Sequence, residues 1–229
     1  MIETFADAAA LAGAASAAVA EALHAGIDVR GRASLIATGG RSPHGVYDRL
    51  VETSIDWSRV TVSLSDDRFV APDDPASNEK LIRERLLIGR AAAARFLPLR
   101  HDAPTPQASA DIADPLLAAL APYDMLLLGM GEDGHVASLI PGSPVLEAGL
   151  DPAGTRSVIG VPAGVGTPPL ARITLTLPAL GRARQTLVLI SGERKREIVS
   201  RERGLPVHAL LEQAKGPVRV LWTRASATA

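Results

Sequence analysis

Short apolar segments alternate with longer, helix-like segments along most of this 229-residue chain. Residues 33–38 (ASLIAT), 60–64 (VTVSL) and 125–128 (MLLL) have the length of buried strands and are too short for independent helices. Further strands are expected at residues 157–161, 172–177, 186–190 and 218–222. Strands separated by helices predict an α/β fold with a mostly parallel sheet and helices on both of its faces.

Helices are expected where apolar residues recur with helical spacing. Leu11, Ala15, Val19 and Leu23 recur every four residues, which predicts an amphipathic first helix. Three other helices are expected over residues 77–87, 193–203 and 206–213.

Two more helices are predicted from a capping residue followed by proline. Ser42 is expected to cap a helix over residues 43–52. Asp114 is expected to cap a helix through Leu120, with Pro115 at its first position. The proline-containing residues 98–114 are then expected to form a surface connection.

The composition indicates one ordinary globular domain over residues 1–229, with 47% hydrophobic and 21% charged residues. A formal net charge of -1 offers no basic field for nucleic acid or an anionic membrane, so any bound anion must be held locally. The absence of cysteine excludes disulfides and thiolate chemistry and suits a reducing cytoplasm. Residues 8–20 are small and apolar, but they follow Glu3 and Asp7 and are too short for a membrane span, so neither a signal peptide nor a membrane helix is expected.

Residues 124–144 (DMLLLGMGEDGHVASLIPGSP) combine a predicted strand, a glycine-rich turn and a histidine. Asp133 lies two positions before His135, and a short helical segment is expected to follow and to end at Pro141. Histidine titrates near neutral pH, and a neighbouring carboxylate can orient its ring. His135 and Asp133 are therefore candidates for general acid–base catalysis, although a surface histidine in a loop has the same local sequence.

Polar and basic residues also follow other predicted strands. Gly39, Gly40 and Ser42 precede a helix start, where backbone N–H groups can bind an anion or simply form a tight turn. Residues 65–68 (SDDR) follow a strand at its carboxyl end, where open parallel sheets bind ligands; a solvated turn is the alternative. Lys195 opposes a helix dipole unless an anion offsets it, and a solvated charged helix face is the alternative.

Other kinds of site are disfavoured. The G-x-G-x-x-G pattern at residues 129–134 resembles a dinucleotide-binding fingerprint, but Pro141 leaves no room for the helix that it requires. Glu132 and Asp133 would also repel a pyrophosphate. No metal is expected, because the five histidines are scattered and the acidic loop at residues 73–74 lacks the features of a calcium loop. Ser138 lacks the surroundings of an activated nucleophile.

Five segments together resemble the 6-phosphogluconolactonase family, which is related to the glucosamine-6-phosphate deaminases/isomerases. They occur in family order, and the third is the most specific. These segments are TGGRSP (38–43), SDDRFVAPDDPASNEK (65–80), LLLGMGEDGHVASLIPGSP (126–144), RITLT (172–176) and SGERKREIV (191–199). The resemblance implies a Rossmann-like fold and hydrolysis of the δ-lactone of 6-phosphogluconate in the oxidative pentose phosphate pathway, with no metal or organic cofactor.

The resemblance also implies roles for individual residues. The catalytic histidine falls on His135. As a mechanism we expect His135 to activate water, with Asp133 or Asp66 holding its ring. The family commonly has Asp-Glu-Arg where this chain has Asp-Asp-Arg, which leaves the role of Asp67 open. The sugar-phosphate contacts fall on Gly39, Gly40, Ser42, Arg68 and Lys195, with Arg172 as a further contact.

Two rival functions remain to be weighed. The deaminase branch carries a glutamate five residues after its histidine, where this chain has Ile140, and isoleucine cannot shuttle the protons that isomerisation needs. A non-catalytic sugar-phosphate sensor is the other rival, although this chain has no length for a DNA-binding domain and no basic patch. The expected partner is a small sugar-phosphate lactone, and the expected state is a monomer or weak homodimer.

Overall fold

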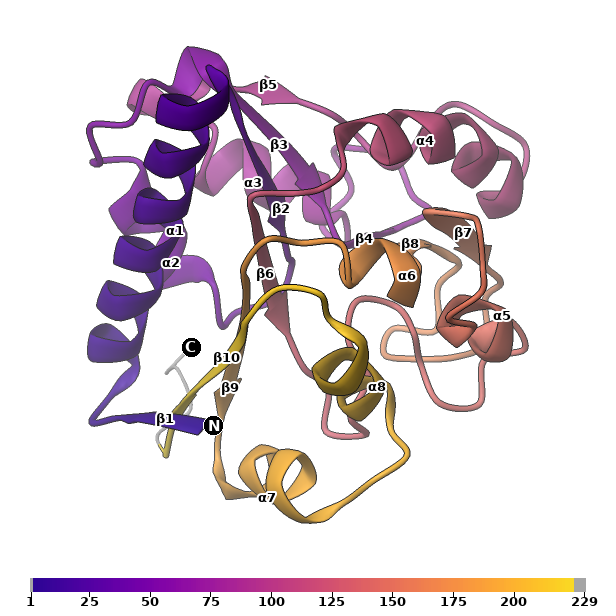
Figure 1. Ribbon diagram of the computed structural model, residues 1–229. Helices are drawn as coiled ribbons and strands as arrows, with labels where there is room; N and C mark the ends of the chain where they lie inside the picture. Colours follow the sequence, from indigo (N-terminus) through magenta and orange to yellow (C-terminus); the bar gives the residue numbers. More distant parts are fainter. Residues whose placement is uncertain (1, 225–229) are drawn as a thin grey trace.

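The computed structural model describes residues 2–224, which are built around a seven-stranded sheet (Figure 1). The strand order is β1-β10-β9-β6-β2-β3-β5, and all neighbours pair in parallel. The strands are β1 (Ile2–Phe5), β2 (Ala33–Ala37), β3 (Val60–Leu64), β5 (Arg95–Phe96), β6 (Met125–Gly129), β9 (Thr186–Ser191) and β10 (Val218–Thr223). Every residue of β2 is buried, as expected for a strand covered on both faces. The predicted α/β, Rossmann-like arrangement is confirmed.

A second, antiparallel sheet was outside the expectation of one parallel sheet. It has the order β4-β8-β7 and contains β4 (Asp66–Arg68), β7 (Val158–Val161) and β8 (Arg172–Leu175). The acidic segment after β3 is therefore a short strand. Its pairing places Arg68 directly opposite Arg172 and Asp66 opposite Thr174, so two basic residues from distant segments become neighbours.

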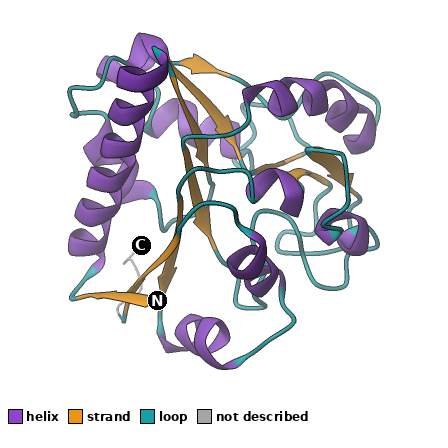
Figure 2. Cartoon of the chain, in the orientation of Figure 1, coloured by secondary structure: helices purple, strands orange, loops and turns teal. Residues whose placement is uncertain are grey.

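Helices lie on both sides of the large sheet, as Figure 2 shows. The α-helices are α1 (Ala8–Arg30), α2 (His44–Leu50), α3 (Asn78–Arg85), α4 (Pro106–Leu120), α5 (Leu146–Leu150), α6 (Leu177–Leu180), α7 (Glu193–Arg201) and α8 (Pro206–Gln213). Two 3-10 helices, η1 (Trp57–Arg59) and η2 (Gly89–Ala93), complete the helical elements of the described residues.

The first helix, α1, packs against α2 and β2 with one apolar face. Leu11, Ala15, Val19 and Leu23 are all buried there, which confirms the predicted periodicity. With 23 residues, α1 is longer than the apolar run and is long and apolar enough, by length and composition alone, to cross a membrane. Half of the residues in its most apolar 18-residue stretch are buried within the fold. An apolar composition is expected of a helix that packs against a protein core in this way.

Two predicted helix starts are wrong. Ser42 does not cap α2, which begins at His44 without a side-chain cap. Helix α4 begins at Pro106 and is capped by Thr105, whose hydroxyl oxygen accepts a hydrogen bond from the backbone N–H of Ala108. Much of the expected surface connection is therefore helical. Pro115 consequently lies inside α4.

The carboxylate of Asp114 has a tertiary role instead of capping a helix. It accepts hydrogen bonds from the backbone N–H groups of Ser157 and Val158, at 2.6 and 2.9 Å. These bonds hold α4 against the start of β7. A local capping rule cannot anticipate a partner more than 40 residues away in the chain.

Candidate active site

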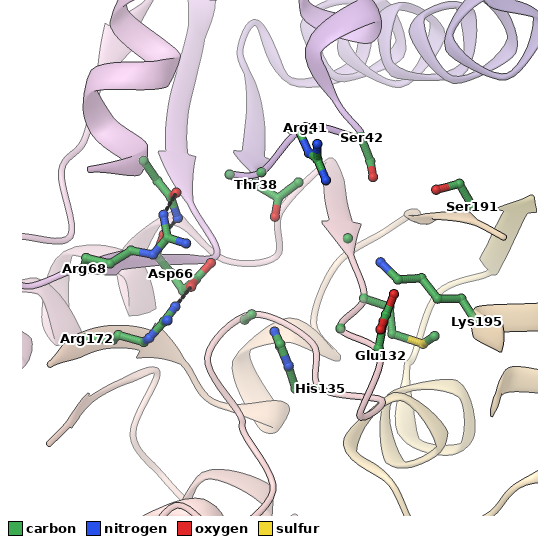
Figure 3. Close-up of a pocket in the computed structure, with 17 residues that line it drawn as sticks. Thr38, Arg41, Ser42, Asp66, Arg68, Glu132, His135, Arg172, Ser191 and Lys195 are labelled. Atoms are coloured by element: carbon green, nitrogen blue, oxygen red, sulfur yellow. Dashed lines mark hydrogen bonds and ion pairs between the residues drawn. The ribbon is translucent and has the colours of Figure 1, made fainter. Parts of the chain in front are cut away.

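A pocket of about 300 Å³ lies beyond the carboxyl ends of β2, β3, β6 and β9 (Figure 3). The chain proceeds from β2 to β3 on one side and from β6 to β9 on the other, so the pocket lies where the strand order reverses. Ligands bind at such a switch point in open α/β sheets. The lining residues are Thr38, Gly39, Gly40, Arg41, Ser42, Asp66, Arg68, Asn78, Gly129, Met130, Gly131, Glu132, His135, Ala137, Arg172, Ser191 and Lys195.

His135 points into this pocket from the loop that follows β6 (Figure 3). Its Nδ1 lies 2.6 Å from Oδ1 of Asp133, and the same oxygen accepts a hydrogen bond from the backbone N–H of His135 at 3.2 Å. If the neutral imidazole donates through Nδ1, its Nε2 carries the lone pair that can accept a proton. The pair can therefore work as a general base held by a carboxylate.

The loop that carries His135 is a turn and contains no helix. Residues 136–139 form a tight turn with a single bridge between Val136 and Leu139, and Ala137 has a φ of 50°. The short helical segment expected before Pro141 is thus wrong. A dinucleotide fingerprint needs a helix directly after its glycines, so this turn supports rejecting that kind of site.

Asp66 does not contact the imidazole. Its Oδ2 accepts a hydrogen bond from the hydroxyl of Ser138 at 2.5 Å and lies 4.0 Å from a guanidinium nitrogen of Arg172. Ser138 is only 1% exposed, so this hydroxyl is a buried donor that joins the histidine loop to the second sheet. Of the two candidate carboxylates, Asp133 is the one in contact with His135.

Arg68 and Arg172 form one basic side of the pocket, with Asp66 between them in Figure 3. The guanidinium of Arg172 donates to the backbone oxygen of Pro168 at 2.9 Å, and the residue as a whole is 4% exposed. Burial lowers its pKa, and the charge of Asp66 partly offsets this effect. The Nε groups of both arginines are buried and have no hydrogen-bond partner among the described residues.

Lys195 forms the opposite basic side, in the first turn of α7 (Figure 3). Burial lowers the pKa of its ammonium group, while the charges of Glu132 and Asp133 raise it and that of Arg41 lowers it. Lys195 is partly buried, and a partly buried cation at the positive end of a helix dipole is unfavourable by itself. A bound anion would relieve both the desolvation and the dipole repulsion.

The structure gathers nearly all the predicted site residues around one pocket. Asp133 does not line it and reaches the site only through His135. Asn78 and Arg41 also line the pocket and were not predicted from the sequence, although Arg41 lies next to the glycine turn. Asp67 does not line the pocket. Its carboxylate instead accepts hydrogen bonds from the backbone N–H groups at the start of α3. The predicted residues that line the pocket are Gly39, Gly40, Ser42, Asp66, Arg68, His135, Arg172 and Lys195.

Within residues 2–224, no three side chains from His, Asp and Glu gather closely enough to hold a metal ion.

Comparisons with known proteins agree with this geometry. The family model described as glucosamine-6-phosphate isomerases/6-phosphogluconolactonase matches residues 6–226. A 6-phosphogluconolactonase of Caulobacter vibrioides is 42% identical over 223 residues, covering 96% of each chain. One from Rhizobium meliloti is 41% identical over 226 residues, covering 95% of this chain and 96% of the relative.

Solved structures give the same relationship. The crystal structure of a 6-phosphogluconolactonase from Shewanella baltica superposes with a TM-score of 0.89 at 35% identity, covering 97% of both chains. A monomeric glucosamine-6-phosphate deaminase superposes with a TM-score of 0.81 at 19% identity, covering 97% of both chains, which shows a shared fold alone. On these matches and this fold, the chain belongs to the glucosamine-6-phosphate isomerase/6-phosphogluconolactonase family.

Proposed function

We propose that this protein hydrolyses 6-phospho-D-glucono-1,5-lactone to 6-phosphogluconate, the lactonase step of the oxidative pentose phosphate pathway. The main support is the contact between His135 and Asp133 at the edge of a small pocket with basic groups on two sides. A pocket of about 300 Å³ suits a sugar phosphate rather than a polymer. The relatives that match over nearly the whole chain carry the name of this activity.

The proposed mechanism needs one base and a set of anion contacts. The phosphate is bound by the turn at residues 40–42, Arg68 and Lys195, with Arg172 as a further contact. Nε2 of His135 then takes a proton from water, and the resulting hydroxide adds to the lactone carbonyl carbon. The imidazolium returns the proton to the ring oxygen as the carbon–oxygen bond breaks. Asp133 holds the ring and stabilises its charged form, and no metal or organic cofactor takes part.

Deamination of glucosamine 6-phosphate is the rival reaction on this fold. It would need an acid–base group where this chain has Ile140. That side chain is 2% exposed, and it is absent from the lining of the pocket. The position can therefore contribute neither a proton acceptor nor a contact to an open-chain substrate, which favours the lactonase.

The protein is further proposed to act as a single domain in the cytoplasm, as a monomer or weak homodimer. Its lack of cysteine suits that compartment, and light scattering at several concentrations would measure the assembly state.

A coupled assay tests the proposed activity. Freshly prepared 6-phosphogluconolactone is supplied, the product is oxidised by a coupling dehydrogenase, and spontaneous hydrolysis is subtracted. Glucosamine 6-phosphate is assayed in parallel for ammonia release. We expect lactone turnover and no ammonia, and we expect His135→Ala to lose about 10²-fold or more in kcat while still binding 6-phosphogluconate. Ammonia release without lactone turnover would establish the rival, and tight binding without either reaction would indicate a sensor.

A further inference from the structure

We propose that Asn78 is a positioning residue for the anion-binding site, and that position 39 is glycine in order to admit it. The side-chain amide of Asn78 holds the guanidinium of Arg68 in the pocket without neutralising its charge. This inference rests on the proposed function only for the identity of the sugar phosphate, since the contacts concern any phosphate bound at Arg68.

Asn78, the first residue of α3, makes two hydrogen bonds to β4, the strand that carries Arg68. Its Oδ1 accepts a hydrogen bond from a terminal nitrogen of Arg68 at 2.9 Å. Its Nδ2 donates to the backbone oxygen of Asp66 at 2.8 Å. The residue is 4% exposed and lines the pocket. Both ends of the amide are thus used, and its orientation follows from these two bonds.

Backbone contacts fix Asn78 relative to Arg68. The carboxylate of Asp67 accepts hydrogen bonds from the N–H groups of Arg68 at 2.8 Å and of Asn78 at 2.6 Å, through the same oxygen. The same terminal nitrogen of Arg68 also donates to the backbone oxygen of Ala76 at 2.9 Å. The guanidinium is therefore held through one terminal nitrogen, which makes both hydrogen bonds. Its buried Nε has no hydrogen-bond partner in the described part of the chain.

Gly39 supplies the space that Asn78 occupies. A β-carbon at position 39 would overlap Oδ1 and Cγ of Asn78 and would lie 2.7 Å from its Nδ2. No small shift resolves that overlap, because the amide is held at both ends. The glycine turn after β2 therefore has a second use beside any backbone contact with an anion: it allows the amide to reach Arg68.

An amide suits this position better than a carboxylate. Asp66 lies two residues before Arg68 on β4, on the same face of the strand, and already offers a competing negative charge. A second carboxylate at position 78 would pair with the guanidinium and weaken its attraction for phosphate. An amide oxygen orients the same nitrogen while leaving the full positive charge for the ligand.

A double-mutant cycle tests the proposal. Affinities of wild type, Asn78→Ala, Arg68→Ala and the double variant are measured by calorimetry with 6-phosphogluconate and with inorganic phosphate. We expect Asn78→Ala to weaken binding about 10-fold or more, the scale of one hydrogen bond to a charged group. We expect the double variant to bind no more weakly than Arg68→Ala alone. Additive losses would overturn the proposal, because Asn78 would then act independently of Arg68.

Two more variants separate positioning from folding. Gly39→Ala should reproduce the loss caused by Asn78→Ala, and Asn78→Asp should weaken phosphate binding although it keeps the side-chain shape. Ser77→Ala is the helix-stability control, because it removes the hydroxyl cap of the same helix start and a 3.3 Å hydrogen bond to Oδ2 of Asp67, but no contact of the Arg68 guanidinium or the Asn78 amide. It should lower the melting temperature but leave phosphate affinity unchanged. If Ser77→Ala weakened phosphate binding as much as Asn78→Ala does, the loss of affinity would be explained by a less stable helix start, and the proposal would be overturned.

Turnover supplies an independent check. In the lactone assay, Asn78→Ala should raise KM and leave kcat nearly constant, because a phosphate contact mainly supplies uniform binding. A fall in kcat at unchanged KM would contradict the inference. If wild type does not hydrolyse the lactone, the proposed function fails, while calorimetry with phosphate still decides the role of Asn78.

Discussion

The imidazole of His135 is held by Asp133, with 2.6 Å between Nδ1 and Oδ1. Asp66, the other candidate, instead accepts a hydrogen bond from the buried hydroxyl of Ser138. The two carboxylates therefore have different expected effects on catalysis, although both were candidates for the same role.

Asp133→Asn should reduce kcat by about 10²-fold with little change in KM. The amide can donate to Nδ1 and so favour the wrong tautomer of His135, which removes the base from the pocket. Asp66→Asn should cost less in kcat, because its carboxylate is not bonded to the imidazole. Steady-state kinetics of the two variants side by side distinguish them. A larger loss of kcat for Asp66→Asn would assign the orienting role to Asp66.

Phosphate affinity should decline with rising pH before free lysine would lose its proton. Burial lowers the pKa of Lys195, so its ammonium form is lost at a lower pH than in solvent, and the neutral amine cannot attract phosphate. Calorimetry with 6-phosphogluconate between neutral and alkaline pH measures the decline. Lys195→Arg is the control, since guanidinium keeps its charge throughout. An alkaline decline that persists unchanged in Lys195→Arg would exclude Lys195 as its source.

The sequence predicted the large sheet well because each strand is a local signal. The runs at residues 60–64 and 125–128 became β3 and β6 with at most one residue added. Their carboxyl ends meet because parallel strands share a direction, which is why residues from four segments could be expected in one site. Position along the strand thus predicted position in the pocket.

The second sheet and its contacts depend on partners distant in the sequence. β4 has three residues, and nothing in Asp66–Arg68 indicates that it pairs with β8 more than 100 residues later. Asn78 illustrates the same limit. In the sequence it is an ordinary residue near a helix start, and only tertiary contacts bring it to Arg68 and against Gly39.

Gly131→Ala should abolish most activity with a modest loss of stability. A β-carbon at position 131 would overlap the imidazole of His135 and lie 2.5 Å from Oδ1 of Asp133, so the pair must separate. We expect kcat to fall about as far as in Asp133→Asn. Gly129→Ala is the matched control at the end of β6, two residues before Gly131, because an added methyl group there meets no atom within 4 Å. Equal kcat losses in the two variants, at equal melting temperatures, would contradict this explanation.

Asp67 should make stability depend on pH in the direction opposite to an ordinary surface carboxylate. Burial raises its pKa to about 6, although the backbone N–H groups of Asn78, Glu79 and Arg68 favour the charged form. The unfolded chain loses this proton near pH 4, so the folded state holds it more tightly between pH 4 and pH 6. The contribution of Asp67 to stability is therefore largest at acid pH and is lost as the pH rises through that window.

Asp67→Asn isolates this effect, because the amide does not titrate. The free energy of unfolding of wild type minus that of the variant should fall by about 2–3 kcal/mol between pH 4 and pH 6.5, then level off. Any constant cost of the amide against the N–H groups of α3 cancels from this slope. Urea unfolding at closely spaced pH values gives the difference, with the exposed Asp28→Asn as the control for removing a carboxylate. A difference that rises with pH would mean that the hydrogen bonds at the start of α3 outweigh burial and keep Asp67 charged.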